Sequence, residues 1–395
     1  MPIVTLLVLG GSLTTGLIIG LLAALKLAMA QQPERLPCSV ATLLNILNSA
    51  FFALMLIAAL VVDYFGTQLS LISGSILLSA SLTGLILVPL SLRSLPLLLG
   101  AGLGTSIFYL SLIQLTPVGL LGTSAIAASL LFGTVLMGMG ALLAYPLLDL
   151  LSTALGYRLS LSLLACFVLL WGVLAFFTPT ELLLFQTGFD PIRVITSGKL
   201  WLAALVFAFY APLEAFVSVW VTTYLTKRDA ATSDNPSVDP SGATGDPRDQ
   251  AAGWVAWFWL ALLGSRVLLG SFLHLSTLQD AWQPFFLIIP ALMTAVVFGN
   301  LSGSSTTRQA LYGVILLGFF LGPVLPTLLA IVARLAIGSA LAVALLHIGG
   351  AVGGVILSPL VNSGVKERSA ASALWIPLFL SLALTATAMF FTLSG

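Results

Sequence analysis

Long apolar runs, separated by short polar connections, follow one another along the whole chain. A helix needs about 20 mainly apolar residues to cross the hydrocarbon core of a bilayer. Runs of this length predict twelve transmembrane helices, at residues 3–29, 38–62, 68–90, 95–116, 119–148, 157–178, 199–226, 253–275, 282–300, 308–334, 336–360 and 369–393. The stretch from 308 to 360 divides only near Arg334, so eleven helices are the alternative count.

The runs of the second half repeat those of the first at a roughly constant offset. Helix five carries Gly140 six positions before Pro146, and helix eleven carries Gly353 six positions before Pro359. Two parallel six-helix repeats are one of the plans of secondary transporters. We therefore predict an all-α polytopic membrane protein with two pseudo-symmetric six-helix bundles, over residues 1–178 and 199–395. Residues 179–198 would form an interfacial linker, and residues 227–252 a flexible polar loop rich in Asp, Ser, Pro and Gly.

The composition also indicates that lipid surrounds most of the chain. Of the 395 residues, 59% are hydrophobic and 7% are charged, whereas a soluble domain is about a quarter charged. The formal net charge of +1 gives no indication of nucleic-acid binding. The two cysteines, Cys38 and Cys166, form neither a disulfide framework nor a zinc-binding pattern. The sequence thus predicts a multi-pass protein of the cell membrane, and we expect no metal and no cofactor.

Several short motifs along the chain resemble elements of the major facilitator superfamily. Asp63-Tyr64-Phe65-Gly66, directly after helix two, is similar to the core of the Asp-x-x-Gly signature between helices two and three of that family. Further similar elements are Gly156-Tyr157-Arg158, Tyr210-x-x-x-Glu214 with Trp220, Phe258-Trp259 with Gly264-Ser265-Arg266, and Gly322-Pro323-Val324-Leu325-Pro326-Thr327. Together they most resemble the fucose–galactose–proton symporter branch and its relatives. The chain departs from the family pattern in two ways. The signature usually carries basic residues at positions that here hold Tyr64, Thr67 and Gln68, and helices one and four have no acidic residue in their interior.

The resemblance implies a twelve-helix major facilitator fold with a cytoplasmic N-terminus. It also implies a gating role for Asp63 and Gly66, in which the carboxylate clamps the bundles near the N-terminal end of a neighbouring helix. Most basic residues in the connections would then lie outside, against the positive-inside tendency. The two indications of orientation oppose each other.

Ionisable residues near helix midpoints are candidates for function, because a charge at the bilayer centre costs at least ~2.5 kcal/mol. Glu214 shares a helical face with Tyr210, and it could carry a coupled proton or be a structural partner of Arg266. Arg266 follows Trp259 by seven residues and could bind a carboxylate or a hydroxyl of a solute, or support a helix junction. His347 could relay a proton or be a hydrogen-bonded packing residue.

The first half offers neutral polar groups instead. Tyr109 and Gln114 in helix four, and Asn45 and Asn48 in helix two, could hydrogen-bond a neutral solute or fasten helices together at about 0.6 kcal/mol each. Small-x-x-x-small spacings that allow close helix contact occur at four glycine pairs, Gly16/Gly20, Gly100/Gly104, Gly349/Gly353 and Gly350/Gly354.

The main hypothesis is a secondary active transporter that moves a small polar or amphipathic solute by alternating access, with Glu214 as the proton-coupling candidate. Its solute-binding candidates are Tyr109, Gln114, Tyr210, Glu214, Trp220, Trp259, Arg266 and His347. Expected partners are the solute, the lipid bilayer and a proton, and we expect a monomer. A non-transporting scaffold or sensor on the same fold is the alternative. An enzyme is disfavoured, because the chain has no P-loop, no metal-ligand spacing and few acidic residues or histidines.

Overall fold

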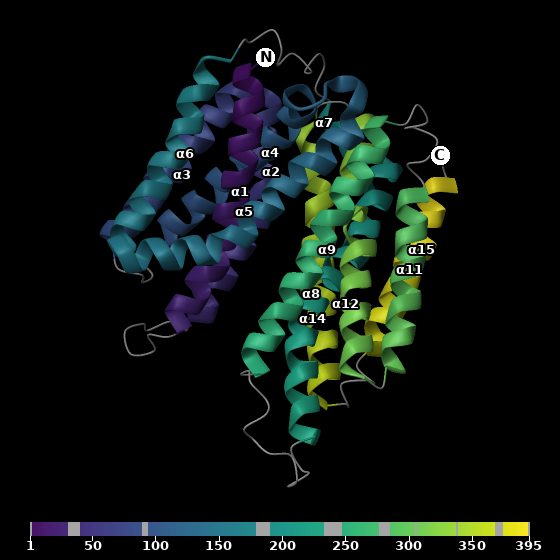
Figure 1. Ribbon diagram of the computed structural model, residues 1–395. Helices are drawn as coiled ribbons and strands as arrows, with labels where there is room; N and C mark the ends of the chain where they lie inside the picture. Colours follow the sequence, from purple (N-terminus) through teal and green to yellow (C-terminus); the bar gives the residue numbers. More distant parts are fainter. Residues whose placement is uncertain are drawn as a thin grey trace. The chain divides into compact units, whose positions relative to one another are not determined.

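A computed structural model of the protein describes residues 2–30, 40–88, 94–178, 190–232, 247–275, 285–304, 306–336, 339–367 and 374–393. Within these ranges, several side chains are not described, including those of 21–30, 40–50, 218–232, 247–252 and 357–367. Helices make up almost all of the described chain, and no β-strand occurs in these ranges (Figure 1).

The N-terminal half consists mainly of long helices. They are α1 (Pro2–Ala30), α2 (Val40–Phe65), α3 (Thr67–Leu87), α4 (Leu95–Gly119), α5 (Ile126–Leu155) and α6 (Tyr157–Phe176), followed by the short α7 (Pro191–Thr196). One 3-10 turn, Thr123–Ala125, precedes α5. Within this half α1 packs mainly against α5, α2 packs against α4, and α3 lies between α4 and α6.

The C-terminal half has the same character. Its helices are α8 (Gly198–Thr232), α9 (Pro247–Leu275), α11 (Phe285–Ser302), α12 (Thr307–Leu321), α13 (Val324–Leu335), α14 (Ala340–Glu367) and α15 (Trp375–Leu393). Here α9 packs against α8 and α12, and α15 packs against α8 and α11.

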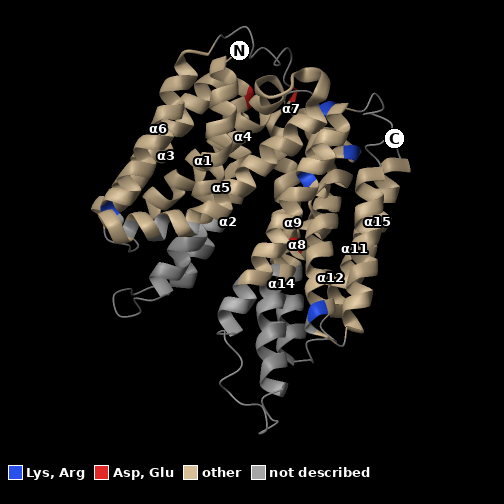
Figure 2. Ribbon diagram, in the orientation of Figure 1, with Lys and Arg blue, Asp and Glu red and all other residues tan. Residues whose placement is uncertain are grey.

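Membrane spans follow the apolar runs of the sequence. In the described part, 10 helical segments are long and apolar enough to cross a bilayer, and Phe51–Phe65 and Ala340–Ile356 are shorter apolar helices. These segments coincide in order with the twelve predicted runs. Charged residues are sparse along the helices (Figure 2), and large apolar side chains such as Leu6, Ile57 and Phe379 are exposed. The protein is therefore an integral, multi-pass membrane protein.

Two boundaries refine the predicted elements. The span Arg308–Leu335 contains both α12 and α13, and α14 begins at Ala340, so the division near Arg334 is confirmed. The predicted loop over 227–252 is too long, because α8 continues to Thr232 and α9 begins at Pro247. Lys, Arg and Ala, which are strong helix formers, occupy most of 227–231. The helix therefore continues beyond the end of its apolar run.

Packing divides the chain into two compact units. The first unit comprises Met1–Ser197 together with Leu329–Ile348, and the second comprises Gly198–Leu328 together with Gly349–Gly395. The last half of α13 and the first third of α14 thus pack with the N-terminal helices. The sequence repeat placed residues 199–395 in one bundle and did not indicate that part of this range packs with the N-terminal helices.

Glycines allow helices to approach each other closely in each unit. In the first unit, a Cβ added to Gly140 of α5 would meet the carbonyl oxygen of Leu13 in α1. In the second unit, a Cβ added to Gly353 of α14 would meet the carbonyl oxygen of Ala208 in α8. Gly140 and Gly353 are equivalent positions of the sequence repeat, so both bundles bring the corresponding helices into backbone contact. Of the predicted small-residue pairs, close packing is confirmed at Gly353, whereas Gly354 meets no atom within 4 Å.

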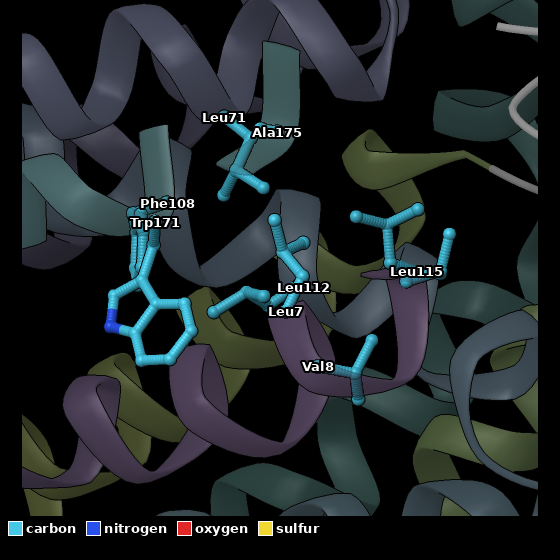
Figure 3. Close-up of a cluster of buried hydrophobic side chains, with 9 residues drawn as sticks. Leu7, Val8, Leu71, Phe108, Leu112, Leu115, Trp171 and Ala175 are labelled. Carbon is cyan, nitrogen blue, oxygen red and sulfur yellow. The ribbon is translucent and has the colours of Figure 1, made fainter. Parts of the chain in front are cut away.

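The core of the first unit is built from aliphatic and aromatic side chains of α1, α3, α4 and α6. Figure 3 shows the cluster, in which Leu7, Val8, Leu71, Phe108, Leu112, Leu115, Trp171 and Ala175 are labelled. The indole nitrogen of Trp171 donates a hydrogen bond to the hydroxyl of Thr14, at 2.7 Å. This bond satisfies the polar end of a buried aromatic side chain, as buried tryptophans require.

Candidate functional site

The turn between α2 and α3 depends on Gly66, whose φ is 82°. Residues with a Cβ rarely adopt this backbone conformation. The N–H of Gly66 donates to the carbonyl of Val62 at 3.0 Å, and the N–H of Ser70 donates to the carbonyl of Gly66 at 3.1 Å. Asp63 lies in the last turn of α2, three residues before Gly66, and its side chain is 4% exposed.

Asp63 binds the N-terminus of α14 within the first unit. Its Oδ1 accepts the N–H of Ala340 at 2.6 Å, and its Oδ2 accepts the N–H of Leu341 at 2.9 Å and the hydroxyl of Ser339 at 3.1 Å. The first N–H groups of a helix have no partner inside the helix, and that end carries a partial positive charge. A carboxylate supplied by α2 therefore caps the N-terminus of α14.

Gln114 belongs to the same polar network. Its amide nitrogen lies 3.4 Å from Oδ1 of Asp63, and its carbonyl oxygen accepts the hydroxyl of Thr67 at 2.8 Å. The chain of contacts joins α4, the start of α3, Asp63 and the start of α14. In this conformation Gln114, a candidate for solute binding, holds the carboxylate that caps α14.

A second polar contact joins α4 to α14. The hydroxyl of Tyr109 lies 2.7 Å from Nε2 of His347, and Nδ1 of His347 lies 2.8 Å from the carbonyl oxygen of Val343. The two rings meet edge to face, with centroids 5.2 Å apart. Both side chains are buried. The structure thus brings together two residues that lie 238 positions apart in the sequence.

The second unit contains a separate cluster of buried polar groups. Tyr210 is fully buried in α8 and interacts electrostatically with Glu214, one turn later, and with Arg266 in α9. Its hydroxyl makes no hydrogen bond of ordinary geometry among the described residues. Arg266 is 5% exposed, and Glu214 is partly buried. The prediction that Tyr210 and Glu214 share a helical face agrees with this arrangement.

Arg266 also supports a broken helix. Its Nε donates to the carbonyl oxygen of Gly322 at 2.8 Å, at the break between α12 and α13. In a continuous helix this carbonyl would accept the N–H of residue 326, but Pro326 has none. Gly322 allows this end of α12 to lie close to α9, because it has no Cβ. A Cβ at this position would meet the carbonyl oxygen of Leu262 at 2.5 Å. Arg266 therefore supplies the donor that Pro326 lacks.

The remaining predicted residues are less informative. Trp259 is partly buried, and its ring lies edge to face against Phe258 with centroids 5.5 Å apart. The side chains of Trp220, Asn45 and Asn48 lie outside the described residues. Among the described residues, His, Cys, Asp and Glu form no group of three that could hold a metal ion.

Two partners were missed at the level of sequence: Ser339 and the carbonyl of Gly322. Each has a signal that could have pointed to it. Ser339 immediately precedes the apolar helix from Ala340, and serine is a preferred residue at that position. Pro326 follows Gly322 by four positions, which orphans that carbonyl.

Comparison with solved structures identifies the fold. The Escherichia coli fucose:proton symporter superimposes with a TM-score of 0.75 at 14% sequence identity, over 98% of this chain and 98% of that chain. The human organic anion transporter MFSD10 superimposes with a TM-score of 0.71 at 13% identity, over 98% and 99%. A proton:xylose symporter superimposes with a TM-score of 0.65 at 17% identity, over 98% and 94%. The chain therefore has the major facilitator fold, as its motifs predict.

Comparisons at the level of sequence add nothing to this assignment. No family model matches the sequence, and no curated protein matches it either.

Proposed function

We propose that the protein is a secondary active transporter, which moves a small polar or amphipathic solute across a membrane by alternating access. The single observation that carries this proposal is the capping of α14 by Asp63. A buried carboxylate that satisfies a helix N-terminus on another part of the chain is a contact that can be made in one conformation and released in another. The fold, which is also that of three transporters, supports the same class of function.

The polar cluster of the second unit supports solute binding. Tyr210, Glu214 and Arg266 combine a hydroxyl, a carboxylate and a guanidinium in an otherwise apolar helix bundle. Polar groups that are costly inside a membrane are retained mainly where they bind or relay something.

The solute would be found first by binding. The purified protein in detergent would be heated in the presence of sugars, nucleosides, carboxylates, amino acids or hydrophobic drugs. A ligand present at about 100 times its dissociation constant stabilises the folded state by ~2.7 kcal/mol. A stabilising solute would then be tested for uptake into liposomes that contain the protein, with and without a proton gradient.

The role of Asp63 is tested in the same liposomes. Asp63→Ala should reduce uptake of that solute, because α14 loses its cap, while binding of the solute in detergent persists. Asp190→Ala is the matched control, since Asp190 also caps a helix through Ile192 and Arg193 but does so on the exposed α7. Binding of a solute without any uptake would favour a non-transporting sensor, and equal uptake by wild type and Asp63→Ala would remove the gating role.

A further inference from the structure

The contact between Tyr109 and His347 is a second buried polar contact of α14, and the transport function proposed above does not rest on it. It joins the middle of α4 to α14 on the same helices that Gln114 and Asp63 connect. Along α14, His347 follows Leu341 by six residues, which corresponds to about 9 Å along the helix axis. The first third of α14 is therefore held at two levels, at its N-terminus by Asp63 and further along by Tyr109.

The geometry determines the tautomer of the neutral imidazole. A backbone carbonyl can only accept, so the contact with Val343 requires a proton on Nδ1 of His347. In the neutral ring Nε2 then has no proton and accepts the hydroxyl of Tyr109. Neutral His347 thus uses both ring nitrogens, one as a donor and one as an acceptor.

We propose that His347 is the proton-binding residue of the transport cycle, and that its protonation releases the first third of α14 from α4. This inference rests on the proposed function, because it assigns the coupled proton within that cycle. It places the proton at α14, whereas the sequence favoured Glu214 in the second unit.

Protonation changes this contact in a definite way. Nε2 becomes a donor, so the hydroxyl of Tyr109 must turn its own proton away from the ring. The imidazolium ion is also costly in a buried, apolar place. Charged His347 therefore favours a conformation in which water reaches the ring. A ligand that binds one of two conformations better shifts the population toward it, and the ligand here is the proton.

The ionisable groups on the neighbouring elements leave this role to His347. From α2, Asp63 is bound to the N-terminus of α14. From α4, Tyr109 is the only ionisable residue between Leu95 and Gly119. Where α8 packs against α14, at Gly349, Gly350 and Gly353, it presents Ala204, Phe207, Ala208 and Ala211.

The experiment uses the chain's small number of histidines. It has 2, His347 and His274, and His274 is exposed at the end of α9. In the full-length His274→Gln variant, labelled with nitrogen-15 histidine and placed in lipid nanodiscs, one imidazole signal remains. At neutral pH it should report the neutral form with the proton on Nδ1. On acidification the doubly protonated form should appear.

Release of α14 is measured by hydrogen–deuterium exchange of the amides of 340–348, at the same two pH values. On acidification, exchange should become roughly fivefold faster relative to His347→Gln, the factor expected for loss of one hydrogen bond. Glutamine can bond to Tyr109 but cannot be protonated. After division by the intrinsic rate at each pH, exchange in Tyr109→Phe at neutral pH should match that in acidified wild type. This variant replaces His347→Gln in the test if His347→Gln fails to fold.

Three results would overturn the inference. They are a neutral ring that carries its proton on Nε2, an equal acid effect in His347→Gln, and a protonation of His347 that leaves exchange of 340–348 unchanged. None of these readouts depends on a solute. A protein that transports nothing in liposomes would therefore refute the proposed function separately, whatever the imidazole does.

Discussion

Arg266 and Pro326 should be energetically coupled, although they are not adjacent in the sequence. The carbonyl of Gly322 lacks its helical donor because of Pro326, and Nε of Arg266 replaces that donor at 2.8 Å. Two single substitutions separate these roles. Arg266→Met removes the donor and the charge but keeps an unbranched side chain, and Pro326→Ala returns a backbone N–H at the position that Gly322 needs.

The size of the effect follows from the contact. A hydrogen bond from a charged group contributes about 1.5–3 kcal/mol, and polar contacts between membrane helices reach at most about 1.7 kcal/mol in double-mutant cycles. We therefore expect Arg266→Met to cost about 1.5 kcal/mol in the wild-type background. In the Pro326→Ala background the carbonyl has its own donor, so the same substitution should cost about 1 kcal/mol less. What remains would report the interactions of Arg266 with Tyr210.

The four proteins (wild type, the two single variants and the double variant) form a double-mutant cycle. A competing effect changes the stability of Arg266→Met but cancels in this cycle. Removal of a buried charge can stabilise a protein by relieving its desolvation, which could mask the lost hydrogen bond. That gain is the same in both backgrounds, so the difference between backgrounds cancels it. The coupling energy is thus the quantity to measure.

The assay is reversible unfolding of the four proteins in mixed micelles with rising sodium dodecyl sulfate, followed by tryptophan fluorescence. The reasoning would be refuted by additivity, meaning that the cost of Arg266→Met is equal in the two backgrounds within about 0.3–0.5 kcal/mol. Coupling of the opposite sign would refute it as well.

Three further predictions concern packing and turns, and each is checked by the same unfolding assay. Gly353→Ala should destabilise by about 1–3 kcal/mol, because the new Cβ meets the backbone of α8, whereas Gly354→Ala has open space and should gain about 0.5–1 kcal/mol. Equal effects at the two glycines would contradict the packing. Gly66→Ala should cost about 1–2 kcal/mol, because φ is 82° there, and an unchanged stability would mean that the turn can adopt another backbone conformation. Thr14→Val should cost about 1–3 kcal/mol by leaving the buried indole N–H of Trp171 without its acceptor, and a neutral result would show that the indole finds another partner.

Part of the candidate site could be predicted because its signals are local. Asp63 and Gly66 stand three residues apart, and a turn with positive φ demands a glycine at a fixed place. Tyr210 and Glu214 share a face because four residues make about one helical turn. These relations hold along one helix, and they need no knowledge of which helices are neighbours.

The partners across helices could not be predicted in the same way. Nothing in the residues around Asp63 names Ser339 and Ala340 as its donors, and nothing around Tyr109 names His347. Such contacts depend on how helices pack, and in lipid that packing is decided by many small van der Waals contacts, without a hydrophobic difference between protein and solvent.

By itself, the sequence determined that this chain crosses a membrane about twelve times as helices in two repeated halves. The physical reason is that a backbone in hydrocarbon must satisfy its hydrogen bonds within each span, so the apolar runs set the helices directly. Only the tertiary structure decided that Leu329–Ile348 packs with the N-terminal helices and that Asp63 caps α14. Equally, only the tertiary structure showed that Arg266 donates to the carbonyl of Gly322, which Pro326 leaves without its helical donor. Each of these outcomes depends on the distance between residues that are far apart in the chain, and only packing sets that distance.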